Sequence, residues 1–260
     1  MFDYAKEEAV TGIKEEFIYK YKSLSKPEYI LHILDIIENS RLYLPDVKEL
    51  NDVFECPNSV VFPGTAGSSI WFQAGKLPPV ILEKRNGFKV LSLTDNHLNP
   101  VMWAHYADNY HGICLIFNKI AFGSVSKVSY VEHSNHFYHD GEIEDYDEFI
   151  LESLKRKHEE WKYESEFRLI QRTDNQFLSF GNNLRGVIFG HKYKKNRSIE
   201  CALDKKQIPK FKTYIDEIEG KIVIVDYNFE PILDGRKYDY IEFIDGEFVK
   251  KEDLYLMKNL

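Results

Sequence analysis

The chain has 260 residues, a formal net charge of −8 and a high aromatic content, with 17 Tyr and 18 Phe. A chain of this length can bury a large core, and its aromatic content is not that of a disordered protein. The net negative charge argues against a protein that coats nucleic acid by bulk electrostatics, but it is compatible with a local basic groove.

The cysteines and the N-terminal residues indicate a cellular compartment. Cys56, Cys114 and Cys201 are odd in number and far apart, which fits neither a disulfide framework nor a zinc-binding motif. The N-terminus is charged from Asp3 onward, unlike a secretory signal, and no apolar run is long enough to span a bilayer. The sequence therefore predicts a cytoplasmic protein without a membrane partner, and by this indirect argument a bacterial one.

The first quarter of the chain predicts short elements followed by a long loop. Residues 17–22 alternate as in a strand, Pro27 lies in the first turn of a helix, and residues 42–44 form a short strand. The segment 57–79 is rich in Gly and Ser. It predicts a long loop, which could close over a site as a lid.

The next elements follow one another closely. Residues 88–94 predict a strand, and Asp95 or Asn99 caps a helix over 100–108. That helix ends at His111-Gly112, and a strand over 113–117 follows it.

The chain then predicts a strand over 127–131, an exposed loop over 132–145 and one long helix over 149–161. That helix leads into a buried strand that ends near Arg172. Another strand is expected over 184–190.

The last part of the chain predicts a helix over 203–218 and a strand over 221–226. A hairpin over 241–249 follows, with Asp245 and Gly246 as its two-residue turn.

Strand and helix patterns mix along the whole chain, which predicts an α+β fold with mostly antiparallel sheets and flanking helices. No composition shift marks a domain boundary, so we expect one domain over residues 1–260. No glycine-rich phosphate loop precedes a helix, which disfavours a kinase or a Rossmann domain.

A charged row occurs on the strand that follows Trp161. In an extended chain Glu164 and Glu166 point to one face, and Arg168 continues that face. Phe167 and Leu169 point the other way, toward a core. Such a row is either an ion-pair ladder or a reaction site.

The helix after residue 100 carries a second group of candidate residues. His105 and Tyr106 share a face with Met102, and Trp103 lies on the next face. Together with Ser92 on the preceding strand they could form a polar, aromatic pocket. The alternative is that the aromatic residues belong to the core and that His105 is a satisfied internal histidine.

His133, His136 and His139 are spaced three apart beside acidic residues. Metal binding there competes with the simpler interpretation, a solvated acidic loop, which we favour because nothing pre-organises the side chains. We therefore expect no metal.

Four stretches of the chain resemble the family catalogued as domain of unknown function 2971. The resemblance covers about residues 17–190, which leaves 191–260 as an extension, and this chain has Val53 where the family usually has Pro. It implies no activity. The stretches are Ile18–Lys22; Leu42–Leu44 with Leu50–Glu55; Val90–Thr94 with Met102–Asp108 and Gly112–Phe117; and Trp161–Arg168.

A second resemblance does imply an activity. Lys20, then Ser92-Leu-Thr94, then Glu164-Ser-Glu166 are similar in order and strand placement to the motifs of ADP-ribosyltransferases of the Arg-Ser-Glu type. This chain has Lys where that family has Arg, so gripping of the pyrophosphate or ribose would differ. The resemblance implies a fold like that of this family and an enzyme, either an ADP-ribosyltransferase or an NAD glycohydrolase, with NAD as its substrate.

On this resemblance, Glu166 would stabilise the positive charge that develops on the ribose as nicotinamide leaves. Glu164 would position or activate an acceptor, which could be a protein, a nucleic-acid base or water. Lys20 would hold the pyrophosphate, and Ser92 and Thr94 would orient the ribose and support Glu166.

The remaining candidate residues have supporting roles. His105 could bind a phosphate or accept a proton. Tyr21, Trp103 or Tyr106 would stack on the nicotinamide. The other candidate substrate-binding residues are Arg168, Asn51 and Asp52.

Two other functions stay open. Asn51, Asp52, Glu55, His105 and Glu164 are residue types that a metal-dependent nuclease or phosphodiesterase uses. Alternatively, the chain is a non-catalytic domain that senses a nucleotide or binds a protein, with its turn residues Asn51 and Asp52 in a structural role. A toxin or phage-defence effector is the biological context that we expect for an enzyme of this kind.

Overall fold

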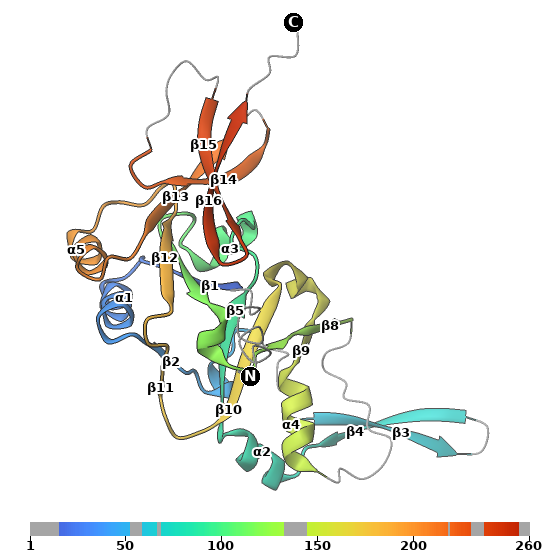
Figure 1. The fold of residues 1–260 in the computed structure, drawn as a ribbon. Coiled ribbons are helices and arrows are strands. Elements are labelled where there is room, and N and C mark those ends of the chain that lie inside the picture. Colours follow the sequence, from blue (N-terminus) through green and yellow to red (C-terminus); the bar gives the residue numbers. More distant parts are fainter. Residues whose placement is uncertain are drawn as a thin grey trace, which may run out of the picture. The chain divides into compact units, whose positions relative to one another are not determined.

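The computed structural model describes residues 16–52, 59–66, 69–132, 145–217, 219–229 and 237–254 (Figure 1). The chain divides into two compact units, each made of segments that are distant in the sequence. The first unit comprises Met1–Glu38, Trp103–Ala121 and Gly181–Leu260. The second unit comprises Asn39–Met102 and Phe122–Phe180.

The first unit contains a run of five strands in the order β14-β13-β12-β6-β1. Neighbouring strands are antiparallel except β12 and β13, which are parallel and are joined through helix α5 (Arg197–Lys205). Helix α1 (Pro27–Asn39) also belongs mainly to this unit. The strands are β1 (Phe17–Lys22), β6 (Ile113–Asn118), β12 (Leu184–Phe189), β13 (Lys210–Asp216) and β14 (Lys221–Asp226).

Strand β6 is the centre of the first unit. All six of its residues are buried, which follows from a nearly continuous apolar run paired on both sides, with β1 and with β12. The α3–β6 turn packs tightly: a Cβ atom at Gly112 would lie 2.3 Å from the Lys22 carbonyl oxygen, and one at Gly190 would lie 2.0 Å from that of Tyr110. Only glycine fits at these two positions.

A hairpin of β15 (Lys237–Ile244) and β16 (Glu247–Leu254) completes the first unit. Its turn residues Asp245 and Gly246 have φ of 48° and 81°, as a two-residue turn with positive φ at both positions requires, so the predicted turn is confirmed. The ring of Phe248 lies 5.3 Å from that of Phe17 and 4.8 Å from that of Phe211. The hairpin is therefore anchored on the sheet by aromatic contacts.

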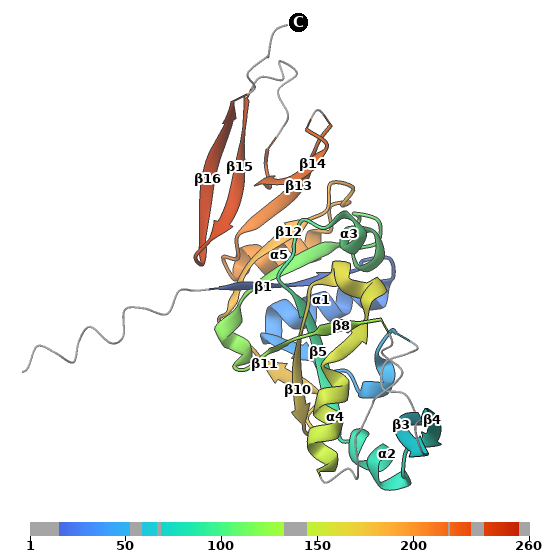
Figure 2. The same ribbon diagram turned by 90° about the vertical axis from the view of Figure 1, so that its right-hand side faces the viewer.

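The second unit contains the antiparallel strand order β5-β10-β7 and several two-stranded sheets (Figure 2). Strand β5 (Phe88–Thr94) pairs along its whole length with β10 (Glu166–Arg172). The other strands are β7 (Ser126–Lys127), β2 (Arg41–Tyr43) with β11 (Phe177–Ser179), β3 (Ser59–Ala66) with β4 (Ser69–Lys76), and β8 (Ser129–Val131) with β9 (Arg156–His158).

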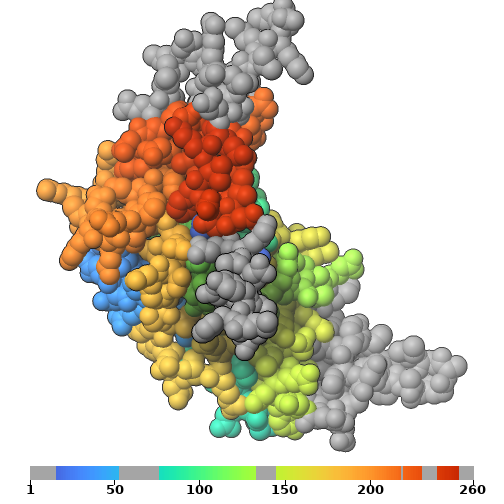
Figure 3. Space-filling model, in the orientation of Figure 1, coloured from blue at the N-terminus to red at the C-terminus, as the bar shows by residue number. Residues whose placement is uncertain are grey.

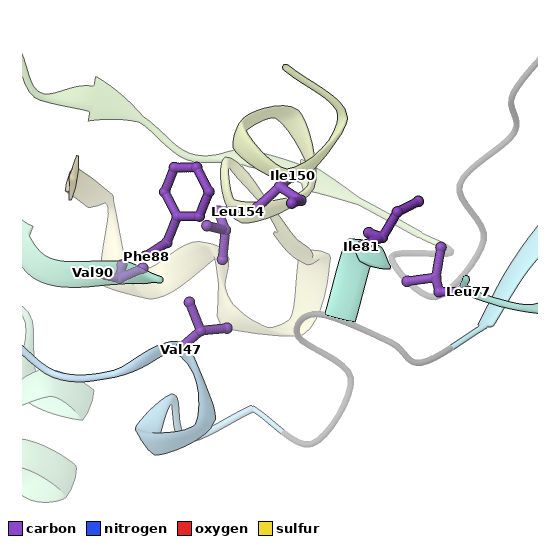
Figure 4. Packing of buried hydrophobic residues seen from close by; sticks show 7 residues of the cluster. All are labelled: Val47, Leu77, Ile81, Phe88, Val90, Ile150 and Leu154. Carbon is purple, nitrogen blue, oxygen red and sulfur yellow. The ribbon is translucent and has the colours of Figure 1, made fainter. Parts of the chain in front are cut away.

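The helices of the second unit are short: α2 (Pro79–Arg85), α4 (Tyr146–Leu154) and the 3₁₀ helices η2 (Val47–Glu49) and η4 (Glu159–Glu164). Helix α3 (Pro100–Tyr106) and the 3₁₀ helix η3 (Lys119–Phe122) each run from one unit into the other. Part of the second unit's core lies between α2, α4 and β5 (Figure 4). It consists of Val47, Leu77, Ile81, Phe88, Val90, Ile150 and Leu154.

Helices and mostly antiparallel strands occur in both units, which confirms the α+β class. Several element predictions are wrong. The segment 57–79 contains the paired strands β3 and β4, the helix expected over 149–161 ends at Leu154, and the helix expected over 203–218 is replaced by the end of α5 and strand β13. Among the described residues, no helix is both long and apolar enough to cross a membrane.

Candidate functional site

The paired acids lie where a 3₁₀ helix becomes a strand. Glu164 is the last residue of η4, and Ser165 has φ of 46° in the left-handed region. Strand β10 therefore begins at Glu166, and the prediction that Glu164 and Glu166 lie together on one extended strand is wrong. Their side chains nevertheless converge, because both contact Lys157.

Four charged side chains form a network that we call the charge cluster: Lys157, Glu164, Glu166 and Arg168. The Lys157 Nζ atom lies 2.5 Å from Glu164 Oε2 and 3.3 Å from Glu166 Oε2. Arg168 binds Glu166 through two hydrogen bonds, from Nε to Oε1 at 2.8 Å and from Nη2 to Oε2 at 2.9 Å. The two cations and two carboxylates balance in charge.

The charge cluster is sealed from solvent. The side chains of its four residues are between 1% and 5% exposed. Removing charges from water costs several kcal/mol per ion, which such a network offsets only when its members stay fully paired. Glu166 and Arg168 lie two apart on β10, and both are buried. They pair as in the ion-pair ladder that was one of the two interpretations of the sequence.

The neighbours of Glu166 determine its ionisation. Burial alone would raise the pKa of this carboxyl, but the charge and hydrogen bonds of Arg168, the charge of Lys157 and a hydrogen bond from Ser92 together lower it to about 2. Glu166 is therefore ionised near neutral pH. The expected support of Glu166 by Ser92 is present in this contact.

Backbone contacts fix the position of the cluster. The Thr94 hydroxyl donates to the Glu164 carbonyl at 2.6 Å, so Thr94 orients the backbone of the acidic pair. The Glu166 amide donates to the Tyr130 hydroxyl at 2.8 Å. Arg168 Nη1 donates to the Leu154 carbonyl at 2.7 Å, which ties β10 to the C-terminus of α4.

Lys157 is the member of the cluster that the sequence did not reveal. The sequence predicted a long helix over 149–161 at this point, but Lys157 lies on β9, opposite Tyr130 in a parallel pair with β8. Its ammonium also lies 4.9 Å from the centre of the Trp161 ring. The burial of Lys157 depends on the pairing of β9 with β8, which is distant in the sequence. The residues next to Lys157 therefore show no periodicity that would predict it.

Trp103 and Tyr21 belong to the core of the first unit. Trp103 is fully buried, with its ring 5.1 Å from that of Tyr21 and 5.7 Å from that of Tyr110. Tyr21 is buried as well, which raises the pKa of its hydroxyl. These contacts match the core interpretation of Trp103 rather than a nicotinamide platform.

The other residues of α3 are more accessible. His105 is exposed and Tyr106 is half-buried, with 6.3 Å between their rings. Asn99 caps the helix, accepting hydrogen bonds from the amides of Val101 at 2.8 Å and Met102 at 3.3 Å. Of the two expected capping residues, the structure selects Asn99.

The residues of the predicted NAD site are divided between the two units. Lys20 lies on β1 of the first unit, opposite Leu115, whereas Ser92, Thr94 and Glu166 belong to the second. The structure brings Ser92 and Glu166 together, and the convergence of Lys20 with them stays a prediction.

The candidate metal ligands are only partly covered by the structure. Asp52 is buried and Asn51 is exposed, both next to η2. Glu55 and the histidines at 133, 136 and 139 lie outside the described residues. In the part of the chain that the structure describes, no three His, Cys, Asp or Glu residues are grouped as metal ligands.

A groove of about 820 Å³ lies in the first unit beside the loop between α5 and β13. Arg185 and Lys206 line it together with Asp245 and Glu247 of the hairpin turn. Its charges are therefore mixed, and its apolar lining comes from Phe17, Leu184, Ile208, Pro209 and Phe248.

Residues 102–169 match the family described as protein of unknown function (DUF2971). The predicted resemblance to this family is confirmed over that segment. It runs from α3 into β10 and contains all four residues of the charge cluster. No curated protein and no solved structure matches the chain.

Proposed function

We propose that this chain is a non-catalytic binding module in which the charge cluster is a structural element. The observation that carries this proposal is the environment of Glu166, whose side chain is 3% exposed and is held by Arg168, Lys157 and Ser92.

A carboxylate that stabilises a reacting ribose must have an acceptor position open to that sugar. A carboxylate has about four acceptor positions. Two hydrogen bonds from Arg168, one from Lys157 and one from Ser92 occupy about that number on Glu166. A ribose hydroxyl would have to displace one of these donors and leave a buried charge without its partner, which is costly.

A catalytic pair of acids should face a cleft, whereas acids sealed by cations indicate a sensing or interaction domain. Glu164 is paired with Lys157, and Glu166 with both Lys157 and Arg168. This pairing favours the second class.

One observation favours a second candidate, an NAD-dependent ADP-ribosyltransferase or NAD glycohydrolase. Ser92 hydrogen-bonds Glu166, and the antiparallel register sets Ser92 opposite Arg168 and Thr94 opposite Glu166. In that proposal NAD binding would open the Arg168 pair, and Glu166 would then accept from the ribose. A toxin or phage-defence role would follow from that activity alone.

A cytoplasmic location belongs to the same proposal. Cys114 is buried and Cys201 is exposed, and both are free thiols. An exposed free thiol suits a reducing compartment.

Nicotinamide release from NAD tests the two candidates. The wild-type protein and Glu166→Gln are incubated with NAD, alone and with protein or nucleic-acid acceptors, and Glu160→Gln on the exposed side of η4 is the matched control. We expect no release above background from any of the three. Release by the wild type and Glu160→Gln that disappears in a folded Glu166→Gln would establish the enzyme and overturn the binding module.

A further inference from the structure

Positive charge is concentrated in one segment of the first unit. Residues 191–212 contain eight Lys or Arg and two Asp or Glu, a net charge of +6, which leaves −14 for the rest of the chain. The segment forms the loop before α5, the helix itself and the start of β13. Figure 3 shows orange atoms of this part of the chain at the surface.

Lysines of this segment lie over aromatic rings. Lys195 and Lys210 place their ammonium groups 6.0 Å and 5.3 Å from the centre of the Tyr227 ring. Lys212 lies 5.9 Å from the centre of the Phe229 ring and also donates a hydrogen bond to the Phe229 carbonyl. The Tyr214 ring lies 5.5 Å from that of Phe229. We call these six residues the basic–aromatic stripe.

The stripe follows one face of strand β13. Lys210, Lys212 and Tyr214 are half-buried, and they alternate with the buried Phe211 and Thr213. Lysines on sheets often protect an unpaired edge from aggregation. That explanation does not fit here, because β13 is paired on both sides, with β12 and with β14.

The central ring of the stripe is held in place. The Tyr227 hydroxyl donates to a Glu200 carboxylate oxygen at 2.8 Å, and its ring lies 4.9 Å from that of Phe189. A fixed ring presents its face at low entropic cost. Of the three lysines, Lys210 pairs with Asp204 at 2.6 Å, and within the described part of the chain no carboxylate pairs with Lys195 or Lys212.

We propose that the basic–aromatic stripe binds single-stranded nucleic acid. Surfaces that bind single strands combine cations that follow the phosphates with rings on which bases stack, which is the combination found here. A base that stacks on Tyr227 would displace a lysine, whose ammonium would then reach the adjacent phosphate. This inference rests on the proposed function, since it names the ligand class of the binding module.

The geometry favours a single strand over two other polyanions. In a duplex the bases are stacked on one another, so their faces are closed to Tyr227 and Phe229. The carboxylates of an acidic polypeptide would pair with the lysines, but such a polypeptide has no bases that could stack on the rings. Both serve as competitors in the test.

Fluorescence polarisation with labelled single strands of about 15 nucleotides, within the usual range of site sizes, measures the binding. The double variant Lys195→Ala/Lys210→Ala should weaken binding by on the order of tenfold or more and reduce the slope of log K against log salt by about 0.7 for each lysine. Tyr227→Leu should weaken binding by roughly tenfold, whereas Tyr227→Phe, which keeps the ring, should bind nearly as well as the wild type.

Lys127→Ala is the matched control, because Lys127 is an exposed lysine 5.5 Å from the Phe167 ring in the second unit. It should leave affinity unchanged. Absence of binding, equal loss in the Lys127→Ala control, or equally strong competition by duplex or polyglutamate would overturn the inference. These results leave the proposed function intact, whereas nicotinamide release would overturn that function whatever the binding result.

Discussion

The charge cluster of the second unit and the basic–aromatic stripe of the first share one kind of contact. In each, a lysine lies over a ring: Lys157 is 4.9 Å from the centre of Trp161, and Lys210 is 5.3 Å from that of Tyr227. Lys157 is 2% exposed and contacts two carboxylates, whereas the Lys210 side chain is 20% exposed and pairs with the exposed Asp204. Burial and counter-charge therefore separate a structural lysine from one that can meet a ligand.

The largest effect is expected from breaking the charge cluster. Arg168→Met removes the two hydrogen bonds to Glu166 and leaves a buried carboxylate short of donors. Its cost should be about 3–5 kcal/mol in the free energy of unfolding. Urea denaturation measures this loss.

Arg172→Met is the control on the same strand. Arg172 pairs with Asp147 at 2.7 Å, but its side chain is 50% exposed, so the loss should be below about 1 kcal/mol. Equal losses at the two positions would show that burial does not set the strength of these pairs.

Acid should weaken the cluster next. The folded-state pKa of Glu166 is about 2, below its reference value of 4.5, so its stabilising contribution is complete above that reference value. The contribution is lost as the pH falls from about 5 toward 2, and it amounts to about 3 kcal/mol.

Urea denaturation across this range, for the wild type and for Glu166→Gln, measures the effect. The variant should be less stable near neutral pH and should lose less stability on acidification. Parallel pH profiles would show that Glu166 is not held as an ionised carboxylate.

In the first unit, stability should depend on close backbone packing rather than on buried charge. Gly190→Ala would set a Cβ atom 2.0 Å from the Tyr110 carbonyl oxygen, which should destabilise the protein by about 1–3 kcal/mol. Gly181→Ala is the matched control, since nothing lies within 4 Å of its added Cβ atom and only its positive φ costs energy. A larger loss at 181 than at 190 would contradict this account of the α3–β6 turn.

The smallest stability effect is expected in the stripe. Lys210→Ala removes an ion pair with an Asp204 side chain that is 62% exposed, so the free energy of unfolding should change by less than about 1 kcal/mol. Thermal and urea denaturation measure this change. A loss as large as that of Arg168→Met would make Lys210 structural and would remove the contrast between the two regions.

Local patterns predicted the elements whose sequence carries its own signal. The sequence predicted two strands with the limits that the structure shows, β5 (Phe88–Thr94) and β14 (Lys221–Asp226). The Asp245-Gly246 turn was also predicted, because few residue pairs adopt positive φ at both positions.

The elements that the sequence did not predict depend on a residue that ends a helix or on pairing with a strand that is distant in the sequence. Pro209 lies inside the helix expected over 203–218 and cannot donate to a helical hydrogen bond, so the chain leaves α5 and begins β13 there. Strand β9 follows α4 directly and pairs with β8, and this pairing buries Lys157. The sequence identified Glu164, Glu166 and Arg168 as one charged group, but the cation that joins both acids became visible only through this long-range pairing.

The central claim is that the charge cluster supports the fold and takes no part in ligand chemistry. The most direct test is a variant with all four charges removed, Lys157→Met/Glu164→Gln/Glu166→Gln/Arg168→Met, which a buried ion network can tolerate when all of its members are replaced together. After circular dichroism has verified its fold, it is titrated with the labelled single strand. The account predicts the affinity of the wild type, and a folded variant that no longer binds would contradict it.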